Sequence, residues 1–325
     1  MAVCQVEETR YGNLGASPQM GYRGDATTPL SQSSFDICVV GHITRDIIRI
    51  GRTKRTTPGG TGYYTSIALS RLGLKVAVLT KVAESDRAGL LRELSMNEIA
   101  TFLKESKTTS AFENAYSGGD PGTRVQRISS VGTPFSPEDV EEITATLFHV
   151  GPLTNRDIPL QLLKQLATRA KIVSLDVQGM LRPARVGPVS EEDWPEKQKG
   201  LAFVDILKAN EKEALVLSGQ KIVDRAAPAL ASLGPKEVII TMGSRGSLIY
   251  AEQALHRIPC CSSRKIEDPT GCGDTYVAGY LYQRLKGTTP KTAGRFAAAM
   301  ATLKLEGSGP FSGSEADVYD LLPCI

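Results

Sequence analysis

The sequence is poor in the patterns that build metal centres, disulfide frameworks and membrane spans. It has only three histidines in 325 residues, and its six cysteines stand in no Cys-x-x-Cys or Cys/His spacing, so the pattern of a zinc site is missing. No apolar run approaches the ~20 residues of a membrane-spanning helix. No basic segment followed by an apolar one stands near the start, so a secretory signal is not expected. Because Cys38 lies in an apolar run that favours a buried thiol, we expect a cytoplasmic protein with no membrane partner.

Charge of one sign is also scarce. The chain has 38 basic and 35 acidic residues, a net charge of +3, and the basic residues are dispersed, so the footprint of a nucleic-acid-binding protein is missing. The Gly-x-x-x-x-Gly-Lys-Ser/Thr motif is absent, which argues against a P-loop nucleotide site. With 41% hydrophobic and 22% charged residues, the composition is that of an ordinary globular chain of one large domain or two small ones.

The pattern of apolar residues divides the chain into an extension and a folded part. Residues 1–34 are rich in Ser, Thr, Gly and Pro, which predicts a disordered extension and leaves an organellar transit peptide open. From Phe35 onwards, short apolar runs alternate with segments of helical period, which predicts an α/β fold with a mostly parallel sheet and helices on both faces. The expected strands are residues 36–40, 75–80, 147–150, 171–176, 204–208, 237–241 and 247–250. The expected helices are residues 86–94, 159–169, 274–286 and 291–305, with a further helix start at Ser136.

A second, smaller sheet is expected in the first half of the fold. Residues 108–117 and 123–129 flank a Gly-Gly-Asp-Pro-Gly turn, which predicts a hairpin. With the strand-like residues 46–56, this hairpin predicts a small sheet that projects from the main domain, formed by about residues 43–58 and 108–130. The sequence does not separate a lid over a substrate from an ordinary surface hairpin.

One stretch near the C-terminal end combines a carboxylate with a glycine-lined helix start. Gly271 and Gly273 allow the backbone to take φ > 0 or to approach a ligand closely, and Asp274 lies in the first turn of the expected helix. Free amides there can hold the charge of a transferring phosphoryl group, while an aspartate takes the proton of an attacking hydroxyl. An aspartate that only caps the helix is an alternative that the spacing leaves equally open.

The stretch 268–274, Asp-Pro-Thr-Gly-Cys-Gly-Asp, resembles the C-terminal signature of the PfkB, or ribokinase-like, carbohydrate kinases. Cys272 stands where that family usually has Ala. The resemblance covers roughly residues 35–310 and implies a three-layer αβα ribokinase-like fold with a small β-sheet lid, a kinase domain at residues 35–325, and ATP and Mg²⁺ as cofactors. The catalytic residues that it implies are Asp274 as the base, Gly271, Cys272 and Gly273 through the turn that they form, and Arg182.

Two motifs in the first third of the chain resemble the substrate site of the same family. Asp46 follows the first expected strand, and family members use an Asp there to bind sugar hydroxyls; a solvated surface charge is the alternative. Gly59 and Gly60 resemble the N-terminal Gly-Gly motif of the family. Tyr64 stands where many of its sugar kinases have an Asn that contacts substrate, so an amide has been replaced by an aromatic ring with one hydroxyl. This difference puts a ribose- or fructose-type substrate in doubt.

Polar side chains also follow the strand that ends at Asp176. Gln178 and Arg182 come directly after it, at the edge where open α/β sheets bind ligands. The planar guanidinium of Arg182 suits a phosphate, and the family resemblance assigns it to the transferring phosphate or the substrate. An ordinary surface arginine is the alternative.

The donor side is indicated by two further family motifs. Asn210 and Glu213 resemble the Asn-x-x-Glu motif, which helps to place Mg²⁺ through its water shell, although the same spacing describes a helix capping box. Thr241, Gly243 and Gly246 match a segment that lines the nucleotide site of the family, or form a tight β-turn.

The family resemblance also implies a bound monovalent cation. In several members, backbone beside the residues that match Asp268 and Thr270, and near Gly307–Gly309, holds such an ion. The cation is therefore an expectation from resemblance, with no support from spacing.

A narrower resemblance concerns the acceptor. Gly41-His42 with Arg45-Asp46, Tyr63-Tyr64 after the Gly-Gly motif, and Asp176–Gly179 with Arg182 resemble the myo-inositol 3-kinase branch of the family, which implies a cyclitol as substrate. A kinase for a pentose, hexose or nucleoside remains an alternative. So does a catalytically silent ligand-binding or scaffold protein on the same fold. We expect a monomer or homodimer that binds a small polyol or sugar.

Overall fold

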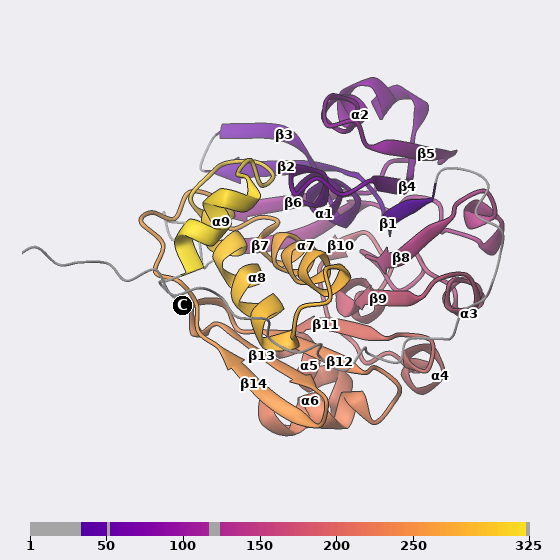
Figure 1. Cartoon of the computed structure of the whole chain (residues 1–325). Coiled ribbons are helices and arrows are strands. Elements are labelled where there is room, and N and C mark those ends of the chain that lie inside the picture. Colours follow the sequence, from indigo (N-terminus) through magenta and orange to yellow (C-terminus); the bar gives the residue numbers. More distant parts are fainter. Residues whose placement is uncertain (1–33, 51–52, 117–123, 323–325) are drawn as a thin grey trace, which may run out of the picture.

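The computed structural model describes residues 34–50, 53–116 and 124–322, so all but the last residue of the expected extension at 1–34 lies outside the described residues. Within them it shows an α/β fold built from a large sheet and a smaller one (Figure 1). The large sheet has the strand order β14-β13-β12-β11-β9-β8-β1-β4-β5. Its strands are β1 (Phe35–Val40), β4 (Val76–Val82), β5 (Ala100–Glu105), β8 (Ala145–Val150), β9 (Ile172–Asp176), β11 (Ile206–Asn210), β12 (Glu237–Thr241), β13 (Ser247–Ala251) and β14 (Ala254–Ile258).

The expected mostly parallel sheet is confirmed. Every pairing from β12 through β11, β9, β8, β1 and β4 to β5 is parallel, and only the edge strands β13 and β14 are antiparallel among the described strands of this sheet. Strand β4 is buried along its whole length, as expected of a parallel strand covered on both faces. All carboxyl ends of the parallel strands therefore meet at one edge of the sheet.

Helices cover both faces, which gives the three layers that were expected. Consecutive residues of a strand point to opposite faces, so Leu147 packs in one core and Phe148 in the other. The first core contains residues of α1 (Thr61–Arg71), α2 (Arg87–Met96), α7 (Cys272–Leu285), α8 (Pro290–Leu305) and α9 (Glu315–Leu321). The second contains residues of α3 (Leu160–Arg169), α4 (Lys197–Leu201), α5 (Glu211–Ser218) and α6 (Val223–Ala231). Helices α7 and α8 pack against each other in front of the sheet in Figure 1.

The smaller sheet has the order β10-β7-β6-β2-β3 and confirms the expected hairpin. Its strands are β2 (Thr44–Ile50), β3 (Thr53–Gly59), β6 (Ala111–Tyr116), β7 (Arg124–Ser130) and β10 (Gly187–Pro188), and the predicted turn at 118–122 lies outside the described residues. The single strand expected at 46–56 is wrong, because β2 and β3 pair antiparallel as two strands. Gly51 is the turn residue that marked the break between them in the sequence.

The helix start expected at Ser136 is also corrected. Ser136 and Asp139 do form a capping box, but it opens only one 3₁₀ turn, η2 (Pro137–Val140). Strand β8 begins at Ala145 and leaves no room for a full helix. Strands β5 and β14 and helix α9 were not expected from the sequence. They lie at the sheet edges and near the chain end, where apolar periodicity is weak.

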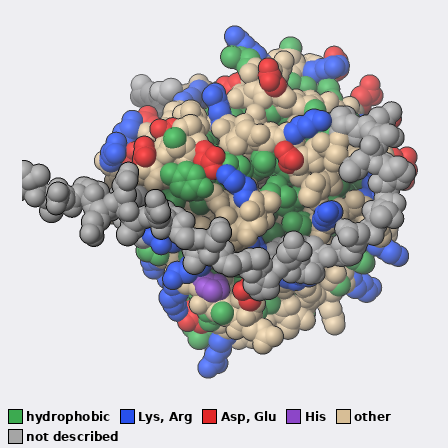
Figure 2. All heavy atoms as spheres, viewed as in Figure 1, with side chains coloured by type: hydrophobic (Ala, Val, Ile, Leu, Met, Phe, Trp, Pro, Cys, Tyr) green, Lys and Arg blue, Asp and Glu red, His purple; other side chains and the backbone are tan. Residues whose placement is uncertain are grey.

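The described surface mixes both signs of charge on the face in Figure 2, where Lys and Arg side chains are interspersed with Asp and Glu. Within the described ranges, none of the helices has the length and apolar character to cross a bilayer.

Candidate active site

A polar cavity of about 180 Å³ lies at the carboxyl edge of the large sheet, beside the small sheet. We call it the central cavity. Its lining residues are Thr44, Asp46, Gly60, Tyr64, Phe112, Gln126, Leu153, Asp176, Gln178, Arg182, Lys208, Pro269, Thr270, Gly271, Gly273 and Asp274. A larger hollow of about 440 Å³ between α6 and β13 contains none of the predicted site residues. The central cavity thus brings together predicted residues from four separate parts of the sequence.

The turn before α7 is shaped by glycine. Gly271 caps the helix with φ 78°, and a Cβ there would overlap the ring of Tyr64, so both the backbone angle and the space require glycine. A Cβ at Gly273 would lie 3.2 Å from Nζ of Lys208. Cys272 does not line the cavity; its Sγ lies 4.0 Å from the carbonyl of Asp268, and burial raises its pKa to about 11. Cys272 therefore belongs to the site only through its backbone.

Asp274 lies in the cavity wall, partly exposed, and is not sealed in the interior. Burial raises its pKa to about 6, and the negative charge of Asp176 adds to this rise. Lys208 and a hydrogen bond from Thr61 act in the opposite direction. A carboxyl with a pKa near neutrality is largely ionised at pH 7 and still basic enough to accept a proton, as a general base requires.

Lys208 is a site residue that the sequence analysis did not propose. It lies directly opposite Asp176 on the neighbouring strand, with Nζ 2.8 Å from Oδ2, and the two side chains are 6% and 5% exposed. Burial opposes its charge, but attraction to Asp176, Glu213 and Asp274 raises its pKa above the ordinary value. The signal in the sequence was a charged residue inside an apolar strand pattern.

Asp46 and the Gly-Gly motif meet at the joint of the two sheets. Asp46 lies on β2 opposite Thr57 of β3 and is 7% exposed, so the solvated surface charge is excluded. A Cβ at Gly59 would lie 2.5 Å from the Asp46 carboxylate, so the Asp46 side chain fits only because residue 59 has no side chain. Gly60 lines the cavity itself and caps α1 with φ 83°.

Gln178 and Arg182 reach the cavity from one short turn, η3 (Val177–Leu181). The side chain of Asp176 caps this turn, and its Oδ1 accepts a hydrogen bond of 3.1 Å from the Gln178 amide. Arg182 is 7% exposed, which excludes the ordinary surface arginine. Asp176 therefore contacts both Lys208 and the turn that presents Gln178.

Asn210 and Glu213 lie beside the central cavity without lining it. They form the capping box of α5: Asn210 Oδ1 accepts from the Glu213 amide at 2.9 Å, and Glu213 Oε2 accepts from the Asn210 amide at 2.7 Å. The other oxygen, Glu213 Oε1, is buried and has no hydrogen-bond partner among the described residues. Burial raises the pKa of Glu213, while Lys208 opposes the rise.

This orphan oxygen fits a Mg²⁺ ion that is bound through water. Within residues 34–50, 53–116 and 124–322, no group of three His, Cys, Asp or Glu side chains could hold a metal. Mg²⁺ keeps several waters in protein sites and needs only one or two carboxylates plus phosphate oxygens. Glu213 offers one such carboxylate oxygen.

Thr241, Gly243 and Gly246 also lie outside the central cavity. Thr241 ends β12 directly opposite Asn210, and η4 (Gly243–Arg245) leads into β13. The Met242 carbonyl accepts from the Arg245 amide at 3.2 Å and the Gly243 carbonyl from the Gly246 amide at 3.0 Å, so these residues form a tight turn. The turn lies at the same edge of the sheet as the cavity, one strand beyond Asn210.

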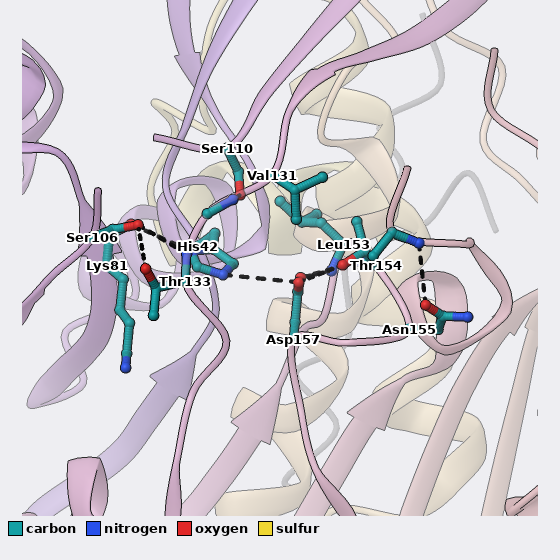
Figure 3. A network of polar contacts seen from close by, with 12 residues as sticks. His42, Lys81, Ser106, Ser110, Val131, Thr133, Leu153, Thr154, Asn155 and Asp157 are labelled. Carbon is teal, nitrogen blue, oxygen red and sulfur yellow. Dashed lines mark hydrogen bonds and ion pairs between the residues drawn. The ribbon is translucent and has the colours of Figure 1, made fainter. Parts of the chain in front are cut away.

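A buried polar network lies next to the cavity (Figure 3). His42, at the end of β1, has Nδ1 3.2 Å from the Lys81 carbonyl and Nε2 3.9 Å from Asp157 Oδ1. Asp157 in turn accepts hydrogen bonds from the amides of Leu153 and Thr154. Leu153 lines the cavity, so this network ties the first strand to the cavity wall.

Lys304 lies behind the turn of residues 268–274 that leads into α7. This residue near the end of α8 is 2% exposed, and its Nζ donates to the carbonyls of Asp268 at 2.8 Å and Gly307 at 3.2 Å. The Asp268 carboxylate lies 3.8 Å away. No pattern in the sequence pointed to Lys304.

A carboxylate at an amide-lined helix start, with buried cations around a polar cavity, defines a site suited to group transfer to a hydroxyl. The sequence model of the pfkB family carbohydrate kinases matches residues 34–317, and the chain belongs to this family of phosphotransferases.

Named relatives cover most of the chain but differ in what they act on. A cytidine kinase of Thermococcus kodakarensis is 29% identical over 258 residues, 76% of this chain and 87% of its own length. A ribokinase of Bacillus subtilis is 25% identical over 313 residues, 88% of this chain and 99% of its own. The structure of a pyrophosphate-dependent kinase of the ribokinase family, complexed with a pyrophosphate analogue and myo-inositol, has a TM-score of 0.79 at 26% identity and covers 87% of this chain and 99% of its own. The ribokinase-like fold and the assignment to sugar or nucleoside kinases follow from these similarities.

Proposed function

We propose that the protein is an ATP- and Mg²⁺-dependent kinase that phosphorylates a hydroxyl of a small cyclic polyol, with myo-inositol as the first candidate. The observation that carries this proposal is the Asp274 carboxylate in the wall of a polar cavity, at the amide-lined start of α7. Around it, the same cavity offers polar groups for an acceptor and cations for a phosphate.

In the proposed reaction, Asp274 accepts the proton of the acceptor hydroxyl as its oxygen attacks the γ-phosphorus. One P–O bond forms to the acceptor while the bond to the β-phosphate oxygen breaks, and the departing ADP keeps that electron pair. The amides of Gly271 and Gly273, two residues that line the cavity, and the cations of Lys208 and Arg182 hold the charge on the transferring group. Asn210 and Glu213 would help to hold Mg²⁺, which neutralises phosphate charge when bound.

The size and lining of the central cavity favour a small polyol. Its volume of about 180 Å³ is below the ~300–1,000 Å³ of sites for drug-sized ligands. Asp46, Gln126 and Gln178 supply hydrogen-bonding groups, while Phe112 and Tyr64 supply apolar faces for ring C–H groups. The small sheet acts as the lid in this proposal, and its closure would keep water from the phosphoryl group.

A nucleoside is the second candidate acceptor, because the curated relative with 29% identity is a cytidine kinase. A nucleoside adds a base to its sugar ring and needs more room than the central cavity gives. This candidate therefore requires the small sheet to move away from the large one. Pyrophosphate is the alternative donor, because a pyrophosphate-dependent kinase is among the similar structures.

A phosphorylation assay tests the proposal. The full chain is incubated with Mg²⁺ and either ATP or pyrophosphate, and with myo-inositol, other cyclitols, ribose, fructose, cytidine or adenosine, and the phosphorylated product is detected. Asp274→Asn serves as the control for contaminating kinases. Preference for a cyclitol with ATP is the expected result. Binding of ATP with no product from any acceptor would instead support a silent binding protein.

A further inference from the structure

We infer that the ammonium group of Lys304 takes the place of a monovalent cation behind the catalytic turn, the residues 268–274 that carry the proposed base, so that the protein works without K⁺ or Na⁺. The family resemblance leads one to expect such an ion near Asp268, Thr270 and Gly307. The residues present do not fit it, because carbonyl oxygens of Asp268 and Gly307 already accept hydrogen bonds from Lys304. The kinetic half of the test below rests on the proposed function, and the thermal half does not.

The contacts of Lys304 are those that a bound monovalent cation makes. Such ions are held by backbone carbonyl oxygens that replace water, and two carbonyls from separate segments meet at this ammonium. The Asp268 carboxylate at 3.8 Å adds a negative charge. An ammonium group and K⁺ carry the same charge and accept the same oxygen ligands. A second cation here would be repelled by the first at short range.

An ordinary helix-end lysine does not account for the whole arrangement. Lysines near a helix C-terminus often bind the last carbonyls of their own helix, and the Gly307 contact is of that kind. The carbonyl of Asp268, however, is 36 residues away in sequence and precedes the catalytic turn. Lys304 is also almost fully buried, which a surface cap does not require.

The bond to Asp268 connects Lys304 to the Thr270 and Cys272 amides on either side of Gly271 through a short chain of contacts. Asp268 Oδ1 accepts a hydrogen bond of 2.9 Å from the Thr270 amide. The carbonyl of Pro269 accepts one of 3.3 Å from the Cys272 amide, at the first turn of α7. Lys304 holds the start of this chain, so it is a positioning residue for the turn and does not touch substrate.

Two substitutions of Lys304 separate the effect of its positive charge from the effect of the space that its side chain fills. Lys304→Ala removes the ammonium and opens a site lined by the same carbonyls, so K⁺ can enter. Lys304→Met removes the charge but fills most of that space, so K⁺ cannot. Lys81→Ala is the matched control, because Lys81 is also buried, at 6% exposure, and pairs with Asp139 at 2.7 Å in a different part of the fold.

The test measures thermal unfolding and turnover while K⁺ replaces tetramethylammonium at constant ionic strength. We expect K⁺ to change neither the unfolding temperature nor the turnover of the parent protein. Lys304→Ala should lose ~10²-fold in turnover through a misplaced turn, and K⁺ should restore both its turnover and its unfolding temperature. Lys304→Met and Lys81→Ala should show no specific recovery with K⁺.

Two results would overturn the inference. One is a parent whose turnover or unfolding temperature rises with K⁺ under these conditions. The other is a Lys304→Ala protein that K⁺ leaves unchanged in unfolding temperature. Because unfolding is measured without substrate, the second result stands even if no acceptor is ever phosphorylated, and failure of the proposed function is recognised separately by the acceptor assay.

Discussion

The ring of Tyr64 lies against Gly271, in the space where any other residue would carry its Cβ. Tyr64 comes from the first turns of α1 and Gly271 from the start of α7, so this contact joins α1 to the turn that carries Asp274. A residue that the sequence presented as a departure from the family pattern is thus also part of the support for the turn.

We expect Gly271→Ala to destabilise the fold and to impair turnover. The backbone angle of 78° costs about 1–3 kcal/mol for a residue with a side chain, and overlap with Tyr64 adds to it. Gly287→Ala is the control, because Gly287 has φ 77° at the other end of α7 with no atom within 4 Å of its built Cβ. Urea unfolding should show a larger loss for Gly271→Ala than for Gly287→Ala. Equal losses of unfolding free energy would mean that overlap with the Tyr64 ring does not destabilise the Gly271→Ala protein.

We expect Asp274→Asn to lower turnover by at least ~10²–10³-fold, as loss of a stabilising or proton-accepting group typically does, while the fold is kept. In the parent, only the ionised carboxylate accepts a proton, and its pKa is about 6. Activity should therefore fall tenfold per pH unit below pH 6 and level off above it. A pH–rate profile with the preferred acceptor checks this. An Asn variant that works at the parent rate would remove Asp274 from the mechanism.

We expect Lys208→Met to lower turnover by ~10²-fold or more with little change in acceptor KM, because the ammonium would act on charge that develops in the transition state. Lys208→Arg should recover part of the rate, since it keeps the charge. Lys81→Met controls for the general loss of a buried ion pair. The most direct measurement is binding of ADP with aluminium fluoride and the acceptor, which mimics the transferring group. Unchanged binding by Lys208→Met would contradict the assignment.

We expect His149 to make the fold sensitive to acid. The ring is fully buried on β8 with Nδ1 3.0 Å from the Ser174 hydroxyl, and burial lowers its pKa from 6.5 to about 4. The unfolded chain therefore binds this proton more tightly than the folded one. The stabilisation is complete above pH 6.5 and lost as the pH falls towards 4.

The lost stability amounts to at most about 3 kcal/mol, from about 2.5 pKa units. Urea unfolding between pH 8 and pH 4 measures it. His149→Gln should flatten the slope between pH 6.5 and 4, whereas His256→Gln on the edge strand β14 serves as the control. An unchanged slope in His149→Gln would show that another group titrates.

The site residues that could be predicted from the sequence are those that belong to a pattern of neighbouring residues. The helical period of the apolar residues after Asp274, the glycines at 271 and 273 and the carboxylate three residues after Gly271 all predict a glycine-lined helix start, and α7 begins there. Asp46, Gln178 and Arg182 were placed by their position just after strand ends, because the carboxyl ends of parallel strands share one edge.

Asn210 and Glu213 show the limit of this reasoning. The spacing of Asn210 and Glu213 describes both a capping box and a metal motif, and the structure contains the capping box with one oxygen left over. The spacing alone could not show that one oxygen of Glu213 caps α5 while the other has no hydrogen-bond partner among the described residues.

From its sequence alone, this protein was determined to be an α/β chain with a carboxylate at a glycine-lined helix start, because periodicity and backbone freedom are properties of neighbouring residues. Tertiary structure alone decided that Lys208 faces Asp176 and that Lys304 reaches the Asp268 carbonyl. Strand register and the approach of distant segments depend on how the whole core packs, and no short run of residues determines that packing.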